Sequence, residues 1–215
     1  MRVVRAMVGK DLRLEWRTRE IVTTMGLLAL LLVIVLGATR ADPEAAPVAM
    51  WVTYAFGATL GFTRTFTLER DHLTALRLAP VDRGAVFIGK ALANWMMLAA
   101  VQIASLPMFG ALFTEKVWAH LPLLALPLVL GGAGLAVTGT LLGGLVVQAR
   151  LREALLPILM LPVILPVLVA AVGATAGIID GQPLSAVGPQ LQLLGAFDML
   201  FVAVSLLLFD AVVEE

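Results

Sequence analysis

Long apolar stretches, separated by short charged ones, dominate the chain. A helix that crosses the hydrocarbon core of a bilayer needs about 20 mostly apolar residues, and each apolar stretch here reaches that length. The pattern predicts an all-α integral membrane protein with a single transmembrane domain over residues 1–215. Its six predicted spans cover residues 21–39, 46–68, 84–113, 121–147, 154–179 and 190–212.

The first apolar stretch, residues 21–39, follows a basic segment, as the core of a signal peptide does. With 19 residues it exceeds a usual signal core and suffices to span a membrane. Further apolar stretches follow it, so we expect it to be retained as a helix.

Proline and glycine shape several of the predicted spans. The third span is long, and we expect it to tilt, or to end before or bend at Pro107. The fifth span contains three prolines, each of which removes a backbone donor and favours a kink. Glycines four residues apart let helix backbones approach closely, although glycine is also common in membrane helices. These residues are Pro157, Pro162 and Pro166, and the pairs Gly57 and Gly61, Gly139 and Gly143, and Gly173 and Gly177.

Composition excludes several classes of protein. The chain is 60% hydrophobic and 14% charged, with a mean hydropathy of +0.99, which is more apolar surface than a soluble domain of this size can bury. Net charge is zero, so no overall basic field attracts nucleic acid. Without cysteine and with only two histidines, the chain has few metal ligands, and we expect it to bind no cofactor by itself.

Lysine and arginine are distributed very unevenly between the two ends of the predicted spans. With the N-terminus inside, 13 of the 15 basic residues fall on the inner side, and only Arg40 and Lys116 fall on the outer side. Because cytoplasmic loops carry the excess of basic residues, we expect both termini to be cytoplasmic.

Residues 1–20 form a predicted basic amphipathic helix. Val4, Val8, Leu12 and Trp16 recur every four residues among six basic side chains. Such a helix lies in the headgroup layer with its apolar stripe toward the lipid. Two roles fit it: anchoring to anionic lipid, or acting as a lever that leads into the first span.

The loop over residues 69–83 contains a second short amphipathic helix between spans two and three. Leu73 and Leu76 share one face, Arg70 and Arg77 are polar, and Pro80 ends the helix. A solvated loop would show the same pattern. If the short helix has a function, we expect its apolar face to bind in a groove of a soluble partner protein.

Residues 84–91 match part of a phosphate-binding loop, Gly-x-x-x-x-Gly-Lys. The Ser or Thr that would hold magnesium is missing, and the segment opens an apolar span instead of following a buried strand. We expect Lys90 to snorkel back to the headgroups. The chain is therefore not expected to supply an ATPase of its own.

Asp198 is the ionisable residue deepest in a predicted span, and by default such a residue is a functional candidate. A structural alternative is a carboxyl group bonded to a Ser, Thr or Gln of a neighbouring helix. His120 follows Trp118 on the outer side, where both are ordinary belt residues, as are Trp51 and Tyr54. Haem ligation by His120 is a more specific interpretation, and it is the less favoured of the two.

Four segments of the chain carry a resemblance to a known family: Glu69-Arg70, residues 76–83, residues 89–95, and residues 155–166 with Pro157, Pro162 and Pro166. Through them nearly the whole chain resembles the CcmB family, membrane proteins of the cytochrome c maturation system that fall within the wider class of ABC-2-type permeases. The chain lacks the glycine that the family usually has between the Glu-Arg pair and the proline.

The resemblance implies a permease subunit, without catalytic activity itself, in the bacterial cytoplasmic (inner) membrane. It implies a CcmA-like ATPase that uses ATP, CcmC-like and CcmD-like membrane proteins, a CcmE-like haem chaperone, haem handled by the complex, and two permease copies. It also implies that the loop is a coupling helix that seats in the ATPase through Glu69, Arg70, Asp71, His72, Leu73, Leu76, Arg77 and Pro80.

Two other functions compete with the permease. A secondary transporter of a small solute would use Asp198. Such a transporter is built from two halves of three spans each, with broken helices at matching positions. Span five contains three prolines, but span two, at the matching position, is not broken in this way. An intramembrane hydrolase would need a His-Glu-x-x-His motif or paired membrane aspartates.

Overall fold

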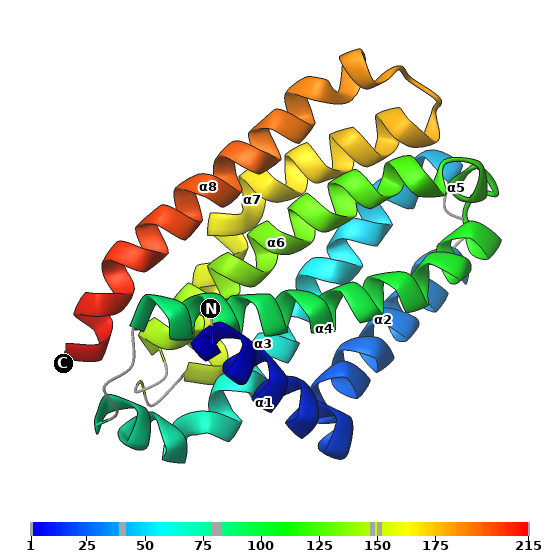
Figure 1. The fold of residues 1–215 in the computed structure, drawn as a ribbon. Helices are drawn as coiled ribbons and strands as arrows, with labels where there is room; N and C mark the ends of the chain where they lie inside the picture. The colour runs from blue at the N-terminus through cyan, green and yellow to red at the C-terminus, as the bar shows by residue number, and fades with distance from the viewer. Residues whose placement is uncertain (1, 39–41, 79–82, 147–148, 150–151, 215) are drawn as a thin grey trace.

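The computed structural model describes residues 2–38, 42–78, 83–146, 149 and 152–214, and the side chains of 64, 66–78, 83, 152–153 and 209–214 lie outside its description. The described chain is helical almost throughout (Figure 1). Its elements are α1 (Arg2–Thr18), α2 (Glu20–Ala38), a 3-10 turn (Pro43–Ala45), α3 (Ala46–Leu78), α4 (Arg83–Leu112), α5 (Lys116–Ala119), α6 (Leu121–Val146), α7 (Arg152–Ile179) and α8 (Leu184–Glu214).

Six of these helices, within the described residues, are long and apolar enough to cross a membrane. They are α2, α3, α4, α6, α7 and α8, in the order that the hydropathy pattern predicts. The predicted class, an all-α multi-pass membrane protein, is therefore confirmed.

Helix bounds differ from the predicted spans by more than two residues at two places, the end of span two and the start of span six. The helix of span two continues to Leu78, so the short helix predicted within residues 69–83 is, as far as Leu78, an extension of α3. In α4 the helix passes through Pro107, and it does not end before that residue. α8 begins at Leu184, six residues before the predicted 190, because Pro189 near its start is accommodated within the helix.

α6 is the central helix of the bundle and packs against α3, α4, α7 and α8 (Figure 1). Its glycines make room for large side chains of other helices, since an added Cβ at Gly131 would meet Trp51 and one at Gly139 would meet Phe62. This is the close approach that small residues allow between membrane helices. Gly57 and Gly61 of α3 allow a similar close approach to α2, since both lie against Met25.

Trp51 and Tyr54 lie in the core and not in an interfacial belt, so the prediction for these two residues was wrong. Both are fully buried. The indole N–H of Trp51 donates to Thr175 Oγ1 at 2.9 Å, and Ser105 Oγ lies 3.2 Å from the Tyr54 hydroxyl. Each polar tip thus has a partner on another helix, which is what allows the ring to leave the interface.

Candidate functional site

The charged end of the bundle brings together α1, the last part of α3 and the start of α4 (Figure 1). α1 runs crosswise to α2 and packs mainly on α4. The backbone at Glu69, Arg70, Asp71, His72, Leu73, Leu76 and Arg77 is helical, whereas Pro80 lies outside the described residues. Because these side chains are also outside the description, their role in binding a partner stays a prediction.

α1 is seated on α4 through a glycine. An added Cβ at Gly89 would lie 2.8 Å from Met7 Cβ and 3.4 Å from the carbonyl oxygen of Val4. The two backbones therefore approach closely here, and any larger residue at 89 would push α1 away from α4.

Lys90, the next residue of α4, is buried under α1, and the prediction that it snorkels to the headgroups was wrong. It is 1% exposed, and the Asp11 carboxylate of α1 attracts its ammonium while Lys10 repels it. Asp11 is itself 5% exposed and lies 3.5 Å from Lys10 Nζ. Buried side chains of opposite charge thus lie at the interface between α1 and α4, where burial of each charge carries a cost that their attraction offsets in part.

The corner between α1 and α2 is closed by a second buried acid. Glu15 accepts hydrogen bonds from the backbone N–H groups of Ile21, at 3.2 Å, and Val22, at 2.8 Å. These two groups belong to the first turn of α2, whose N–H groups have no partner within the helix. Between the helices the chain reverses at Arg19, which has a left-handed φ of 54°.

One turn beyond Lys90, α4 is bonded to two other helices through Asn94, which is fully buried. Its Nδ2 donates to Thr140 Oγ1 of α6 at 2.9 Å, and its Oδ1 accepts from Thr65 Oγ1 of α3 at 3.2 Å. The Thr140 hydroxyl also donates to the carbonyl of Ala136, at 2.6 Å. The hydrogen bonds of Asn94 therefore join the start of α4 to α3 and α6, and the buried charged side chains of Lys90 and Asp11 lie where α4 packs on α1. We call this group of residues the α4 base: Asp11, Lys90, Asn94, Thr65 and Thr140.

Asp198 lies on α8, facing α6 and α7. An added Cβ at Gly134 would lie 2.8 Å from Asp198 Oδ1, and Val167 of α7 flanks the same glycine. Oδ1 is buried and accepts no hydrogen bond from the described residues. The predicted bond to a Ser, Thr or Gln of a neighbouring helix is therefore not present at this oxygen.

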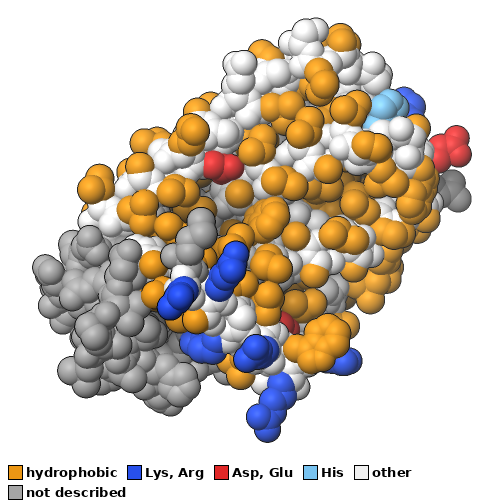
Figure 2. All heavy atoms as spheres, viewed as in Figure 1, with side chains coloured by type: hydrophobic (Ala, Val, Ile, Leu, Met, Phe, Trp, Pro, Cys, Tyr) orange, Lys and Arg blue, Asp and Glu red, His pale blue; other side chains and the backbone are white. Residues whose placement is uncertain are grey.

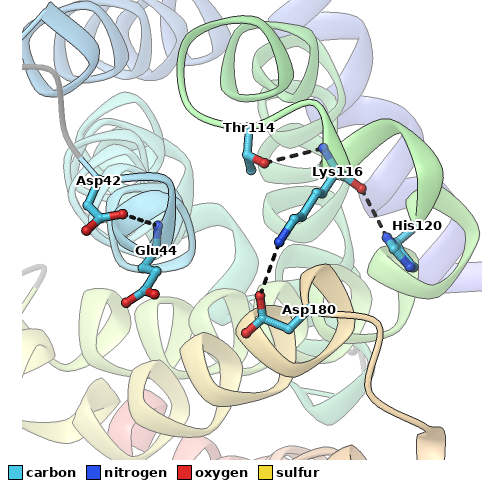
Figure 3. Close-up of polar contacts among 6 residues, drawn as sticks. All are labelled: Asp42, Glu44, Thr114, Lys116, His120 and Asp180. Carbon is cyan, nitrogen blue, oxygen red and sulfur yellow. Dashed lines mark hydrogen bonds and ion pairs between the residues drawn. The ribbon is translucent and has the colours of Figure 1, made fainter.

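At the opposite end of the bundle, polar side chains of three connections lie near one another (Figure 3). Lys116 Nζ of α5 is 4.0 Å from Asp180 Oδ1, which follows α7. His120 Nδ1 lies 3.1 Å from the carbonyl oxygen of Lys116. In the described residues no group of three His, Cys, Asp or Glu side chains is placed to hold a metal ion.

The grouping of residues in the α4 base was missed at the sequence level, where Lys90 was expected to reach the headgroups, although a signal existed on α1. Met7, Asp11 and Glu15 are four residues apart, so they share one face of α1, and this face is the one that packs against the protein. Asn94, Thr65 and Thr140 belong to three helices, and no sequence spacing brings them together.

The comparison with known proteins accounts for the whole length of this bundle. The family model "CcmB protein" matches residues 2–214. The chain is 31% identical over 174 residues to the heme exporter protein B of Rhodobacter capsulatus, covering 77% of this chain and 79% of that protein. It is 26% identical over 191 residues to the heme exporter protein B of Bradyrhizobium diazoefficiens, covering 84% of each. The chain belongs to the CcmB family.

Proposed function

We propose that this chain is the permease subunit of an ATP-driven complex that handles haem in cytochrome c biogenesis. Membership of the CcmB family, whose relatives are named heme exporter protein B, is the observation that carries the proposal. The subunit has no catalytic activity of its own, and a separate CcmA-like chain hydrolyses ATP. The complex lies in the bacterial inner membrane with both termini of this chain in the cytoplasm.

The other members follow from the same family. They are CcmC-like and CcmD-like membrane proteins and a CcmE-like chaperone that receives haem, and two copies of the permease face two ATPase subunits. ATP hydrolysis drives haem delivery or the release of the haem-loaded chaperone. For this to work, ATP must bind the two conformations of the complex with different affinity.

The arrangement of helices at the charged end supports a route by which a movement of the ATPase could be transmitted to the membrane helices. Residues 69–78 extend α3 beyond the apolar part of its span, which ends at Thr63. The next described helix, α4, begins at Arg83, and within its first turns it carries Lys90 and Asn94 of the α4 base. A displacement of the coupling segment by the ATPase would therefore reach α1, α3 and α6 through these contacts.

Purification in gentle detergent of the C-terminally tagged chain from its native host, followed by mass spectrometry, tests the proposal. We expect a stoichiometric small ATPase together with a haem-handling membrane protein. An ATPase without any haem-handling protein would remove the haem assignment and keep the permease. Absence of any ATP-binding chain, also after crosslinking from residues 69–83, would overturn the proposal.

The coupling role of the segment is tested by a paired substitution. Leu73→Asp with Leu76→Asp should leave membrane insertion intact and abolish association with the ATPase, since the apolar face would no longer fit a groove. Leu73→Ile with Leu76→Ile is the matched control and should retain association. Unchanged association of the Asp variant would show that the segment is not the docking element.

A second candidate, a secondary transporter, is favoured by one observation: the buried Oδ1 of Asp198 that accepts no hydrogen bond from the described residues. An acid inside the membrane is costly and tends to be functional. On this alternative, Asp198→Asn alone would abolish activity without any dependence on nucleotide. For the permease we expect the Asn variant to remain active and ATP-dependent.

A further inference from the structure

Charge is segregated across α1. The basic side chains Arg2, Arg5, Lys10, Arg13, Arg17 and Arg19 are all exposed, whereas its two acids, Asp11 and Glu15, are 5% and 7% exposed. Lys10 lies beside one of these acids, 3.5 Å from Asp11. The exposed surface of α1 is therefore more basic than its sequence, because the acids have been turned into the protein. Figure 2 shows basic side chains gathered at this end of the visible face.

The exposed aromatic side chain of Trp16 lies among these basic side chains. Trp16 is 80% exposed, and the guanidinium of Arg19 lies 5.9 Å from the centre of its ring. Both residues are at the corner that leads into α2, of whose apolar window only 22% is buried in the protein. The corner is thus continuous with a helix surface suited to lipid, and tryptophan prefers the level of the headgroups.

The basic face is held in a fixed orientation by the contacts on the other side of α1. Met7 is seated at Gly89, Asp11 is buried on the same side of the helix, and Glu15 accepts the first-turn N–H groups of α2. A helix held in this way presents its arginines as a preformed surface and not as a mobile basic tail, so little ordering of the backbone is needed on binding.

We propose that the basic face of α1 together with the corner that follows it, defined as Arg2, Arg5, Arg13, Trp16, Arg17 and Arg19, binds the phosphate groups of anionic phospholipids. Guanidinium groups match phosphate oxygens in pairs, and a cluster of basic residues at a membrane surface is attracted to anionic lipid. The bound lipid would press α1 onto α4 at Gly89 and so support the α4 base. An acidic protein partner would also meet a basic face, but continuity with α2 and the exposed Trp16 favour lipid.

Native mass spectrometry of the purified chain tests this without any other subunit, so its outcome is independent of the proposed function. The protein in detergent is titrated with dioleoyl phosphatidylglycerol or dioleoyl phosphatidylcholine. We expect phosphatidylglycerol to be retained at least about tenfold more tightly than phosphatidylcholine, with a preference that falls as salt is raised.

Three variants locate the preference. Replacing Arg2, Arg5, Arg13 and Arg17 by Gln should abolish it, replacing the same four by Lys should retain most of it, and Lys116→Gln, at the opposite end, should leave it unchanged. Equal retention of the two lipids by the wild type, or an undiminished preference in the Gln variant, would overturn the proposal.

Discussion

The two ends of the bundle hold their polar side chains in opposite ways. At the charged end Lys90 is 1% exposed and Asn94 is fully buried, and Asn94 is hydrogen-bonded to Thr65 and Thr140 of two other helices. At the other end Lys116 and Asp180 are 61% and 58% exposed and 4.0 Å apart. Buried polar contacts fix helices relative to one another, whereas exposed ion pairs contribute little. The hydrogen bonds of Asn94 therefore hold α3, α4 and α6 together, whereas the Lys116–Asp180 pair adds little to the packing of the two connections that it joins.

The largest expected effect is at Lys90. Lys90→Met removes a buried cation near Asp11, which keeps Lys10 at 3.5 Å, and we expect a loss of about 2–3 kcal/mol in the free energy of unfolding. Thermal unfolding of the purified protein in detergent measures the change. Asp11→Asn combined with Lys90→Met removes both charges and should recover part of the loss. No recovery would show that the charges do not act on each other.

A smaller effect is expected at Asn94. Asn94→Leu removes two hydrogen bonds that join α4 to α3 and α6, at a cost of about 1–2 kcal/mol. The same measurement applies, with Gln102→Leu as the matched control, because Gln102 is also buried on α4 and its Nε2 has no hydrogen-bond partner in the described structure. A larger loss in the Gln102 variant would contradict the importance of the α4 base.

At the corner between α1 and α2, we expect Glu15→Ala to lower the free energy of unfolding by about 1 kcal/mol. Glu15→Ala removes the acceptor of two N–H groups and a negative charge at the start of α2. Hydrogen exchange at Ile21 and Val22 should become faster. Glu15→Gln keeps an acceptor oxygen and should show an intermediate rate, and equal rates in all three proteins would contradict the capping role.

The opposite end should be the least sensitive. We expect Lys116→Gln or Asp180→Asn to change the free energy of unfolding by less than about 0.5 kcal/mol, since the pair is exposed. An effect as large as that of Lys90→Met would abolish the contrast between the two ends.

The sequence was sufficient for the fold and insufficient for the α4 base, for a physical reason. Apolar stretches near 20 residues long have essentially one solution in lipid, so the six helices and their order were predictable. The location of Lys90, Trp51 and Tyr54 was not, because hydropathy describes a residue and not the neighbour that buries it. Lys90 looked like a snorkelling residue until α1 was seen to cover it.

The candidate sites show the same difference between what the sequence predicts and what the structure adds. The partner-binding segment at residues 69–80 came from a local pattern and a resemblance, and it stays a prediction. Asp198 could be singled out from its depth in an apolar stretch, but only the structure shows that Gly134 of α6 gives its carboxylate space. Sequence patterns thus identified isolated residues better than contacts between helices.

The burial of Asp11 against Lys90 also orders the events of biosynthesis. The ribosome makes Asp11 about 80 residues before Lys90, and at roughly 5–20 residues per second this is a delay on the order of 4 to 16 s. During that time α1 has no α4 to dock on, so Asp11 stays in water, whereas the partners of Glu15 at Ile21 and Val22 follow at once. Docking of the first helix made must therefore wait until the start of α4 has been synthesised, and the N-terminus does not reach its final position when it is made.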